Sequence, residues 1–213
     1  MPGKEELFHD QWARSIHIDD VMVDECFESC LAPENRLILT ILGDLKGKKI
    51  LELGCGVGEA SVYFAKKGAC VIATDISAGM LDVVKKLADK FHVGVEVKKA
   101  ESDKIDFDDG TFDIVYAANL LHHVDMDKAL FEAARVLKKD GIFVSWDPLL
   151  HNPLIKIYRM LAHKVRTKGE HPIAVGDRKL FKKYFSRVET RMTWFFTLWI
   201  FIKFFFFTRI FFY

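Results

Sequence analysis

The stretch that decides the fold is Ile50-Leu51-Glu52-Leu53-Gly54-Cys55-Gly56-Val57-Gly58-Glu59. An apolar run from Lys49 to Leu53 ends at a glycine-rich turn, and a helical pattern follows. An apolar run bounded by glycine is typical of a buried parallel strand. Glycine suits the turn because the backbone must bend tightly and because a Cβ atom would hold a ligand away. The stretch therefore predicts the first strand–turn–helix unit of a nucleotide-binding α/β fold.

The spacing of the glycines indicates which ligand the turn accepts. A dinucleotide fingerprint is G-x-G-x-x-G, with the pyrophosphate at a helix N-terminus. Here Gly54, Gly56 and Gly58 give G-x-G-x-G, and Glu59 holds the sixth position. A carboxylate there would repel a pyrophosphate, so we expect a ligand without phosphate groups. Glu52 supports this expectation because an acidic residue at the strand end suits a cationic ligand group.

Four further apolar segments alternate with helical patterns and predict strands over 70–74, 93–98, 114–118 and 142–146. Ser77 and Asp125 are placed to cap the helices after the second and fourth strands. The helix after Asp125 is expected to continue through Lys138 and to stop at Asp140-Gly141. This alternation predicts a doubly wound, Rossmann-like α/β fold. Its sheet is mostly parallel, with helices on both faces and ligands at the strand carboxyl ends.

A carboxylate ends the second strand. Asp75 stands 21 positions after Gly54, where a residue that accepts hydrogen bonds from both ribose hydroxyls is expected. The other role for Asp75 would be helix capping, but Ser77 is better placed for it. We therefore predict that Asp75 binds the hydroxyl groups of a ribose.

Several motifs, in chain order, resemble the class I S-adenosylmethionine-dependent methyltransferases. Their motif I is E/D-x-G-x-G-x-G, which residues 52–58 match, and Asp75 fits the acidic position after the second strand. Residues 107–113 are close to the family's F-x-D-x-x-F-D pattern. L-x-H follows the fourth strand, and K-x-D-G at 138–141 precedes the fifth. The resemblance covers residues 45 to about 150 and implies S-adenosylmethionine as cofactor and methyl transfer as reaction, but no particular substrate.

The resemblance also implies which residues contact the cofactor. In the family an acidic residue after the third strand takes the adenine amino group; Glu101 is the candidate, and Asp103 the alternative. The full predicted set is Glu52, Gly54, Cys55, Gly56, Gly58, Asp75, Ile76, Met80, Glu101, Ser102 and Asn119.

Three residues are candidates for catalysis. A base is needed only if the methyl acceptor is a hydroxyl or an acidic carbon. His123 follows the fourth strand, Asp147 leaves the fifth, and His151 comes soon after. The alternative is that His122 and His123 only shape the pocket at a helix entry.

The chain of 213 residues suits one domain in three parts. Residues 1–45 are expected to form a helical lid, with helices over 5–15, 20–31 and from Pro33; the alternative is that Phe8 and Trp12 only pack on the core. Residues 46–150 form the cofactor-binding core. Residues 151–213 form a basic and aromatic segment expected to face the substrate or a membrane.

The C-terminal segment has an unusual composition. Residues 151–191 hold eleven basic and three acidic residues, and a basic amphipathic helix is predicted over 154–166. A sixth strand is predicted over 187–193. Residues 194–213 are almost wholly apolar, but Lys203 disfavours a membrane span. No clean seventh strand follows, so we expect an atypical or truncated C-terminal hairpin and peripheral contact with an anionic membrane.

Other features narrow the function. The net charge is +1, and the four cysteines show no metal-ligand spacing, so we expect no metal and reduced thiols in a cytoplasmic protein. No signal peptide is expected from the polar N-terminus, and no nucleic-acid recognition motif is visible.

The predicted function is methyl transfer at O or C of a hydrophobic small molecule such as a lipid, isoprenoid or quinone. The alternatives are methylation of a soluble metabolite, and a cofactor-binding regulatory or assembly protein without turnover. The oligomeric state stays open.

Overall fold

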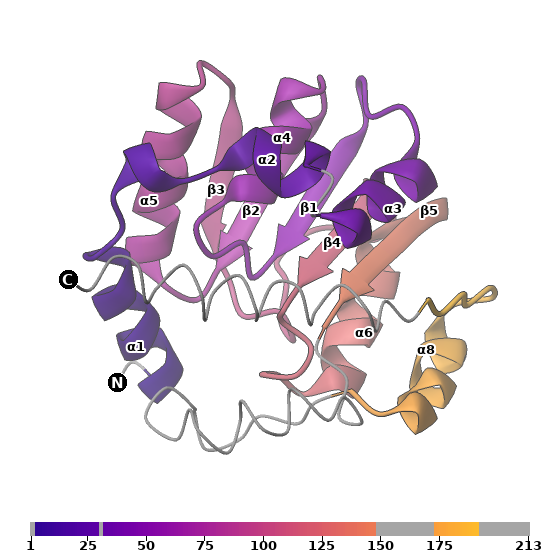
Figure 1. Ribbon diagram of the computed structural model, residues 1–213. Coiled ribbons are helices and arrows are strands. Elements are labelled where there is room, and N and C mark those ends of the chain that lie inside the picture. Colours follow the sequence, from indigo (N-terminus) through magenta and orange to yellow (C-terminus); the bar gives the residue numbers. More distant parts are fainter. Residues whose placement is uncertain (1–2, 30–31, 148–172, 192–213) are drawn as a thin grey trace.

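The computed structural model describes residues 3–29, 32–147 and 173–191, and these form a parallel five-stranded sheet in the order β3-β2-β1-β4-β5 (Figure 1). The strands are β1 (Lys49–Leu53), β2 (Cys70–Asp75), β3 (Val95–Lys99), β4 (Phe112–Ala118) and β5 (Leu137–Trp146). The chain passes outward from β1 to β3 and then crosses to β4 and β5. This reversal beside β1 is where doubly wound sheets bind ligands, and it confirms the predicted fold class.

Helices cover both faces of the sheet, because successive strand residues point to opposite sides. Ile50, Val71 and Tyr116 belong to the core under α2 (Val23–Glu28), α3 (Pro33–Leu42), α4 (Glu59–Lys66) and α5 (Ala78–Lys90). Leu51, Leu53 and Val115 belong to the core under α6 (Met126–Val136). The remaining elements are the short helices η1 (Ile18–Asp20), η2 (Val175–Asp177) and α8 (Arg178–Tyr184).

The N-terminal helices lie in two different places on the sheet. The first helix, α1 (Lys4–Ala13), lies at the end of the sheet to which the arrowheads point in Figure 1, whereas α2 and α3 cover a face of the sheet. Phe27 of α2 stacks on Tyr63 of α4 with ring centroids 4.3 Å apart. Phe8 and Trp12 of α1 are exposed at 39% and 45%, so a substantial part of each side chain does not pack on the core.

The structure corrects several predicted boundaries, including the start of the fourth strand, which is Phe112 rather than 114. The helix after Asp125 ends at Val136 rather than Lys138, and the Asp140-Gly141 pair lies inside β5. The reason is a register shift: Leu137 pairs with Phe112, but the next pairing is Ile142 with Ile114, so the chain bulges between them. The third strand begins at Val95 rather than 93.

The predicted sixth strand, 187–193, is wrong over residues 187–191, which have no regular secondary structure, and its last two residues lie outside the described part of the chain. Arg187 and Glu189 form a local ion pair there, and the Arg187 side chain is 86% exposed, so these two side chains face solvent. The predicted basic helix, the aromatic run and the rest of the predicted hairpin lie outside the described residues. Within the described part, no helix is long and apolar enough to cross a membrane.

Replacement of Gly141 by Ala will destabilise the protein. A Cβ atom at Gly141 would lie 2.7 Å from Leu137 Cδ2 and 3.1 Å from the Asp113 carbonyl oxygen, so the bulge would have to shift. We expect a loss of about 1–3 kcal/mol in the free energy of unfolding, measured by urea denaturation. Gly94 is the control, because a Cβ atom there meets nothing within 4 Å. Equal losses in both variants would contradict the steric account.

Candidate active site

The glycine turn after β1 contains three residues with left-handed backbone, each with different surroundings. Gly54 has φ +62°, and a Cβ atom there would lie 2.7 Å from Leu120 Cδ1. Gly58 has φ +87°, and its Cβ atom would lie 2.6 Å from Val84 Cγ2. Gly56 has φ +51°, and its Cβ atom would meet nothing within 4 Å. Gly54 and Gly58 therefore allow close packing, and Gly56 leaves open space above the turn.

Asp75 borders that open space at the end of β2. One carboxylate oxygen accepts a hydrogen bond from the Gly56 amide at 2.9 Å, and the other accepts from the Ser77 amide at 2.9 Å. An ionised carboxylate has about four acceptor positions, so two are left for donors of a ligand. A ribose diol supplies two such donors, and Asp75 therefore fits the predicted role. Ser77 caps α5 by accepting from the Met80 amide, as predicted.

Glu52 lies beneath the turn and is buried. Its carboxyl group accepts a hydrogen bond from the Ser61 hydroxyl of α4, on the side of the sheet that α4 covers. The pKa of Glu52 is raised from 4.5 to about 8, mainly by burial and also by the nearby Glu59, while the hydrogen bond from Ser61 opposes the shift. Burial also raises the pKa of Glu59. Both side chains lie by the turn, where in their ionised form they would repel a phosphate group and attract a cation.

Three predicted cofactor residues have structural contacts of their own. Cys55 is buried with Ala73 and Leu81, and its amide donates to the Thr74 carbonyl oxygen, which ties the turn to β2. Met80 is fully buried in a cluster with Ala13 of α1, and Ile76 is half-buried.

The remaining predicted cofactor-binding residues lie in the loop after β3 and directly after β4. Glu101 is exposed, and Ser102 beside it is buried. Asn119 has left-handed backbone with φ +52°, and its amide donates to the Trp146 carbonyl oxygen at 2.9 Å. These residues follow β3 and β4, which pair directly with β2 and β1, so the predicted cofactor residues all lie along one edge of the sheet.

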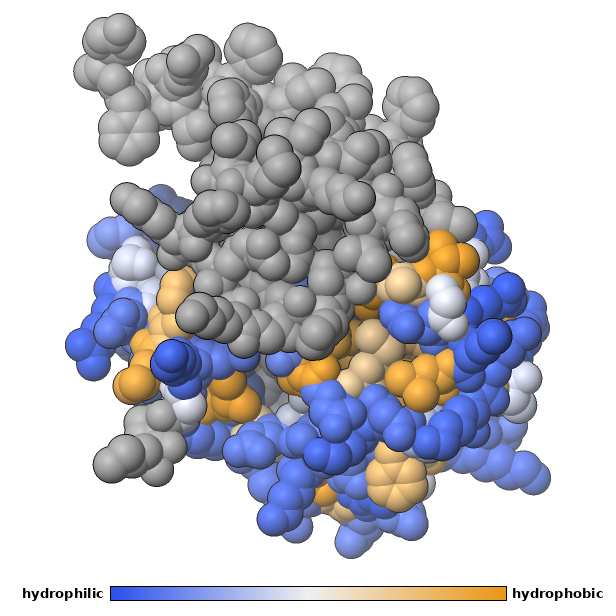
Figure 2. Space-filling view, turned by 90° about the horizontal axis from the view of Figure 1, so that it is seen from below, coloured by the Kyte–Doolittle hydropathy of each residue, from blue (hydrophilic) through white to orange (hydrophobic). Residues whose placement is uncertain are grey.

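Helix α1 contacts this edge through acidic side chains. Asp10 accepts from the Ser77 hydroxyl and from the Gly79 amide, at the N-terminus of α5. These hydrogen bonds lower the pKa of Asp10. Glu6 pairs with Lys99 at the end of β3, and Glu5 lies 2.8 Å from His123 Nδ1 after β4. Figure 2 shows the molecule from this end, with hydrophobic residues among hydrophilic ones.

Asp147 contacts His122 rather than His123. The Nδ1 atom of His122 lies 2.8 Å from Asp147 Oδ1, and the His122 amide donates to the same oxygen at 3.3 Å. The Asp147 side chain has no exposed surface, and burial raises its pKa while the contact with His122 opposes the shift. Among the described residues Asp147 Oδ2 has no hydrogen-bond partner. A buried polar atom without a partner is a place where a ligand or water can complete the site.

The sequence does not single out His122 as a catalytic candidate. A pair of adjacent histidines does not show which ring contacts Asp147, 25 residues later. The two rings are close, with centroids 3.9 Å apart, but His123 contacts Glu5 of α1 while His122 contacts Asp147, the residue after β5. The third catalytic candidate, His151, lies outside the described residues. His122 therefore joins Asp147 and His123 as a candidate.

Fold and turn together define a Rossmann-like domain of the methyltransferase class, and comparisons with known proteins agree. Residues 51–145 match the family model described as a methyltransferase domain. The chain is 29% identical over 149 residues to a sterol 24-C-methyltransferase of Gibberella zeae, covering 68% of this chain and 39% of that protein. It is 38% identical over 117 residues to the demethylmenaquinone methyltransferase of Thermobifida fusca, covering 54% and 49%.

A solved structure shows the same fold: the YcgJ protein of Bacillus subtilis has a TM-score of 0.62 at 23% identity, covering 70% of this chain and 66% of that one. The chain spans about half the length or less of the two curated relatives. Residues 51–145 belong to the S-adenosylmethionine-dependent methyltransferase family, and S-adenosylmethionine is the cofactor of that family. The turn, Asp75 and the acids beneath the turn fit this cofactor, which carries a ribose and positive charge but no phosphate.

Replacement of Glu52 by Gln will reduce the pH dependence of stability. With a folded-state pKa raised from 4.5 to about 8, Glu52 keeps its proton in the folded chain while the unfolded chain releases it. The stabilisation is fully present below pH 4.5 and is lost as pH rises through about 8, at up to about 1.4 kcal/mol per pH unit. Gln keeps an acceptor for Ser61 but cannot ionise. Urea unfolding over this range should show a steeper fall for the wild type, and parallel curves would contradict the account.

Proposed function

We propose that this chain transfers a methyl group from S-adenosylmethionine to an oxygen or carbon atom of a hydrophobic small molecule. The observation that carries the proposal is the presence of two different sites on one sheet edge. Asp75 and the glycine turn offer acceptors and open space for the cofactor. The His122–Asp147 pair offers a base at the ends of β4 and β5. The residues present suit both reactants.

On the cofactor side the chain binds and orients. Asp75 accepts from ribose hydroxyls while the Gly56 and Ser77 amides hold its carboxylate in place. Glu101 is the proposed acceptor for the adenine amino group. When bound, S-adenosylmethionine supplies an electrophilic methyl group on a positively charged sulfur. Glu52 and Glu59 lie near the turn, and positive charge on a bound ligand would favour their ionised forms.

On the acceptor side we assign the base to His122. Asp147 accepts from His122 Nδ1–H, which fixes the tautomer and leaves the Nε2 lone pair to take a proton from a hydroxyl or acidic carbon. The buried carboxylate also stabilises the imidazolium that forms. His123 is the second candidate, and its contact with Glu5 assigns it to the junction with α1. Buried apolar neighbours such as Leu121 help to exclude water.

The hydrophobic nature of the acceptor is supported by the two relatives, which are named for a sterol and a menaquinone precursor. Exposed apolar side chains on α1 at the same edge also support it: Leu7, Phe8 and Trp12. A soluble metabolite is the alternative acceptor, and a protein that binds the cofactor without turnover is the other alternative. Mass spectrometry of a cell extract incubated with protein and methyl-labelled cofactor separates the three, because label enters the organic phase, the aqueous phase or neither.

Replacement of Asp75 by Asn will weaken cofactor binding. Hydrogen bonds to a charged group contribute about 1.5–3 kcal/mol, and calorimetry with S-adenosylhomocysteine should show a loss of that size. Asp82→Asn is the matched control, because Asp82 is an exposed carboxylate that pairs with Lys85 on α5. NAD should not bind to the wild type. Tight binding of NAD without binding of S-adenosylhomocysteine would overturn the proposed function.

Replacement of His122 by Gln will lower turnover by about 10²–10⁴-fold once an acceptor is known, because a general base contributes that much. Asp147→Asn should also lower turnover, since it no longer fixes the histidine tautomer. Affinity for the cofactor should change little in either variant. His123→Gln is the comparison that decides between the two histidines. A larger loss in His123→Gln than in His122→Gln would assign the base to His123.

A further inference from the structure

The loop between β3 and β4, residues 100–111, contains both Glu101 and Ser102 but has little regular structure of its own. The Ala100 amide donates to the Asp75 carbonyl oxygen at 3.1 Å, and the Lys104 amide donates to the Glu101 carbonyl oxygen at 3.1 Å. Glu101 is exposed, so packing does not fix its side chain. What fixes this loop must therefore come from elsewhere in the fold.

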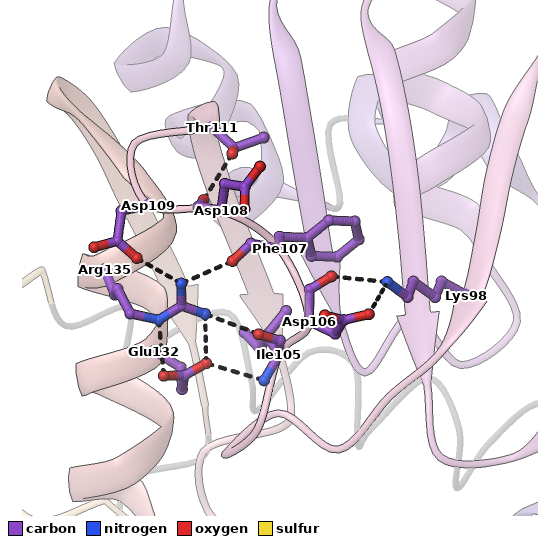
Figure 3. Close-up of polar contacts among 9 residues, drawn as sticks. All are labelled: Lys98, Ile105, Asp106, Phe107, Asp108, Asp109, Thr111, Glu132 and Arg135. Carbon is purple, nitrogen blue, oxygen red and sulfur yellow. Dashed lines mark hydrogen bonds and ion pairs between the residues drawn. The ribbon is translucent and has the colours of Figure 1, made fainter.

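The guanidinium group of one arginine on α6, Arg135, binds backbone carbonyl oxygens of the loop (Figure 3). Arg135 Nη2 donates to the Ile105 carbonyl oxygen at 2.8 Å, and Nη1 donates to the Phe107 carbonyl oxygen at 2.7 Å. Nη1 also donates to the Asp109 carboxylate at 2.7 Å. The planar guanidinium thus holds three points of one loop in a fixed geometry, which a lysine could not reproduce.

Glu132, one turn earlier on α6, completes the contact. Its two carboxylate oxygens accept from Arg135 Nε at 3.0 Å and Nη2 at 2.8 Å, and Oε2 also accepts from the Ile105 amide at 2.9 Å. Ile105 is therefore bound at both its carbonyl oxygen and its amide. The side chains of Arg135 and Glu132 are 23% and 13% exposed, so solvent screens this pair less than a surface ion pair. Arg135 also lowers the pKa of Glu132, which keeps the carboxylate ionised at neutral pH.

A second contact holds the loop from the β3 side. Lys98 donates to the carbonyl oxygen and the carboxylate of Asp106, at 2.7 and 3.0 Å (Figure 3). Its ammonium group also lies 4.4 Å from the centroid of the Phe107 ring. Lys98 and Arg135 thus bind neighbouring residues of the loop from two different elements. Of the two, Arg135 contacts Ile105, which is buried and lies nearest in sequence to Ser102 and Glu101.

We infer that Arg135, oriented by Glu132, is a positioning residue that sets the selectivity of the cofactor pocket for adenine by fixing the loop at Ile105. The inference rests on the proposed function. A hydrogen-bond acceptor discriminates between bases only if it is held in place, because a mobile acceptor can move toward or away from either base. With the loop fixed, Glu101 favours a purine that carries a 6-amino donor over one that carries a 6-oxo acceptor.

The test compares the dissociation constants of S-adenosylhomocysteine and its 6-oxo analogue S-inosylhomocysteine, measured by calorimetry. The readout is the dissociation constant of S-inosylhomocysteine divided by that of S-adenosylhomocysteine, because general destabilisation weakens the binding of both ligands alike. We expect Arg135→Lys to lower this ratio by about tenfold, within the range by which residues that touch neither ligand modulate binding. Glu132→Gln should lower it in the same direction, since Arg135 loses its orienting carboxylate.

Leu42→Ala is the control for general destabilisation. Leu42 is buried at the end of α3 in the core on the opposite face from Arg135, and it precedes the amino end of β1. Its replacement should lower the melting temperature and leave the ratio unchanged.

The outcomes are distinguishable. If the wild type does not bind S-adenosylhomocysteine, the proposed function fails. If the wild type binds and discriminates, but Arg135→Lys and Glu132→Gln discriminate equally well, the inference alone is overturned. If Arg135→Lys does not fold, Glu132→Gln decides the matter. If neither variant folds, the pair is structural and the inference is overturned as well.

Discussion

The hydrogen bond from the Gly56 amide to Asp75 is the interaction on which the rest of the candidate site depends. It joins the turn after β1 to the end of β2, and the second oxygen of Asp75 joins the start of α5 to the same point. A buried carboxylate is stable only when donors surround it, so Asp75 organises the backbone of both connections. The backbone at Gly56 can reach Asp75 because its left-handed conformation costs glycine little.

Buried acids give the site its electrostatic character. Glu52, Glu59 and Asp75 lie along or beneath the turn, and no cationic side chain is bonded to any of them within the part of the chain that the structure describes. This arrangement costs stability, which is why burial raises the pKa of Glu52. Proteins retain buried, destabilising acidic groups where function requires them. A bound ligand with positive charge would reduce the free-energy cost of burying these acids.

Features determined by neighbours in sequence could be predicted. The bounds of β1 and the caps at Ser77 and Asp125 follow from local patterns, and the structure confirms them. Features determined by strand pairing could not be predicted. The bulge that moves the start of β5 to Leu137 depends on its register against β4, and the contact of Asp147 with His122 depends on which strand lies beside β4. The sequence does not reveal the role of Arg135, because two of its partners are backbone carbonyl oxygens 28 and 30 residues earlier, which no side-chain motif shows.

The contact between α1 and α5 has a consequence for how the domain folds. Gly79 lets α1 approach, since a Cβ atom there would lie 3.0 Å from the Cβ atom of Ala13, and Asp10 then completes the N-terminus of a helix 67 residues away. Contacts between distant parts of a chain form late, because a long loop must close first. The start of α5, beside Asp75, therefore reaches its final form only after the first helix has docked. Loss of residues before Arg14 would remove Ala13 from its cluster with Met80 and Val83, while the five strands could still pair.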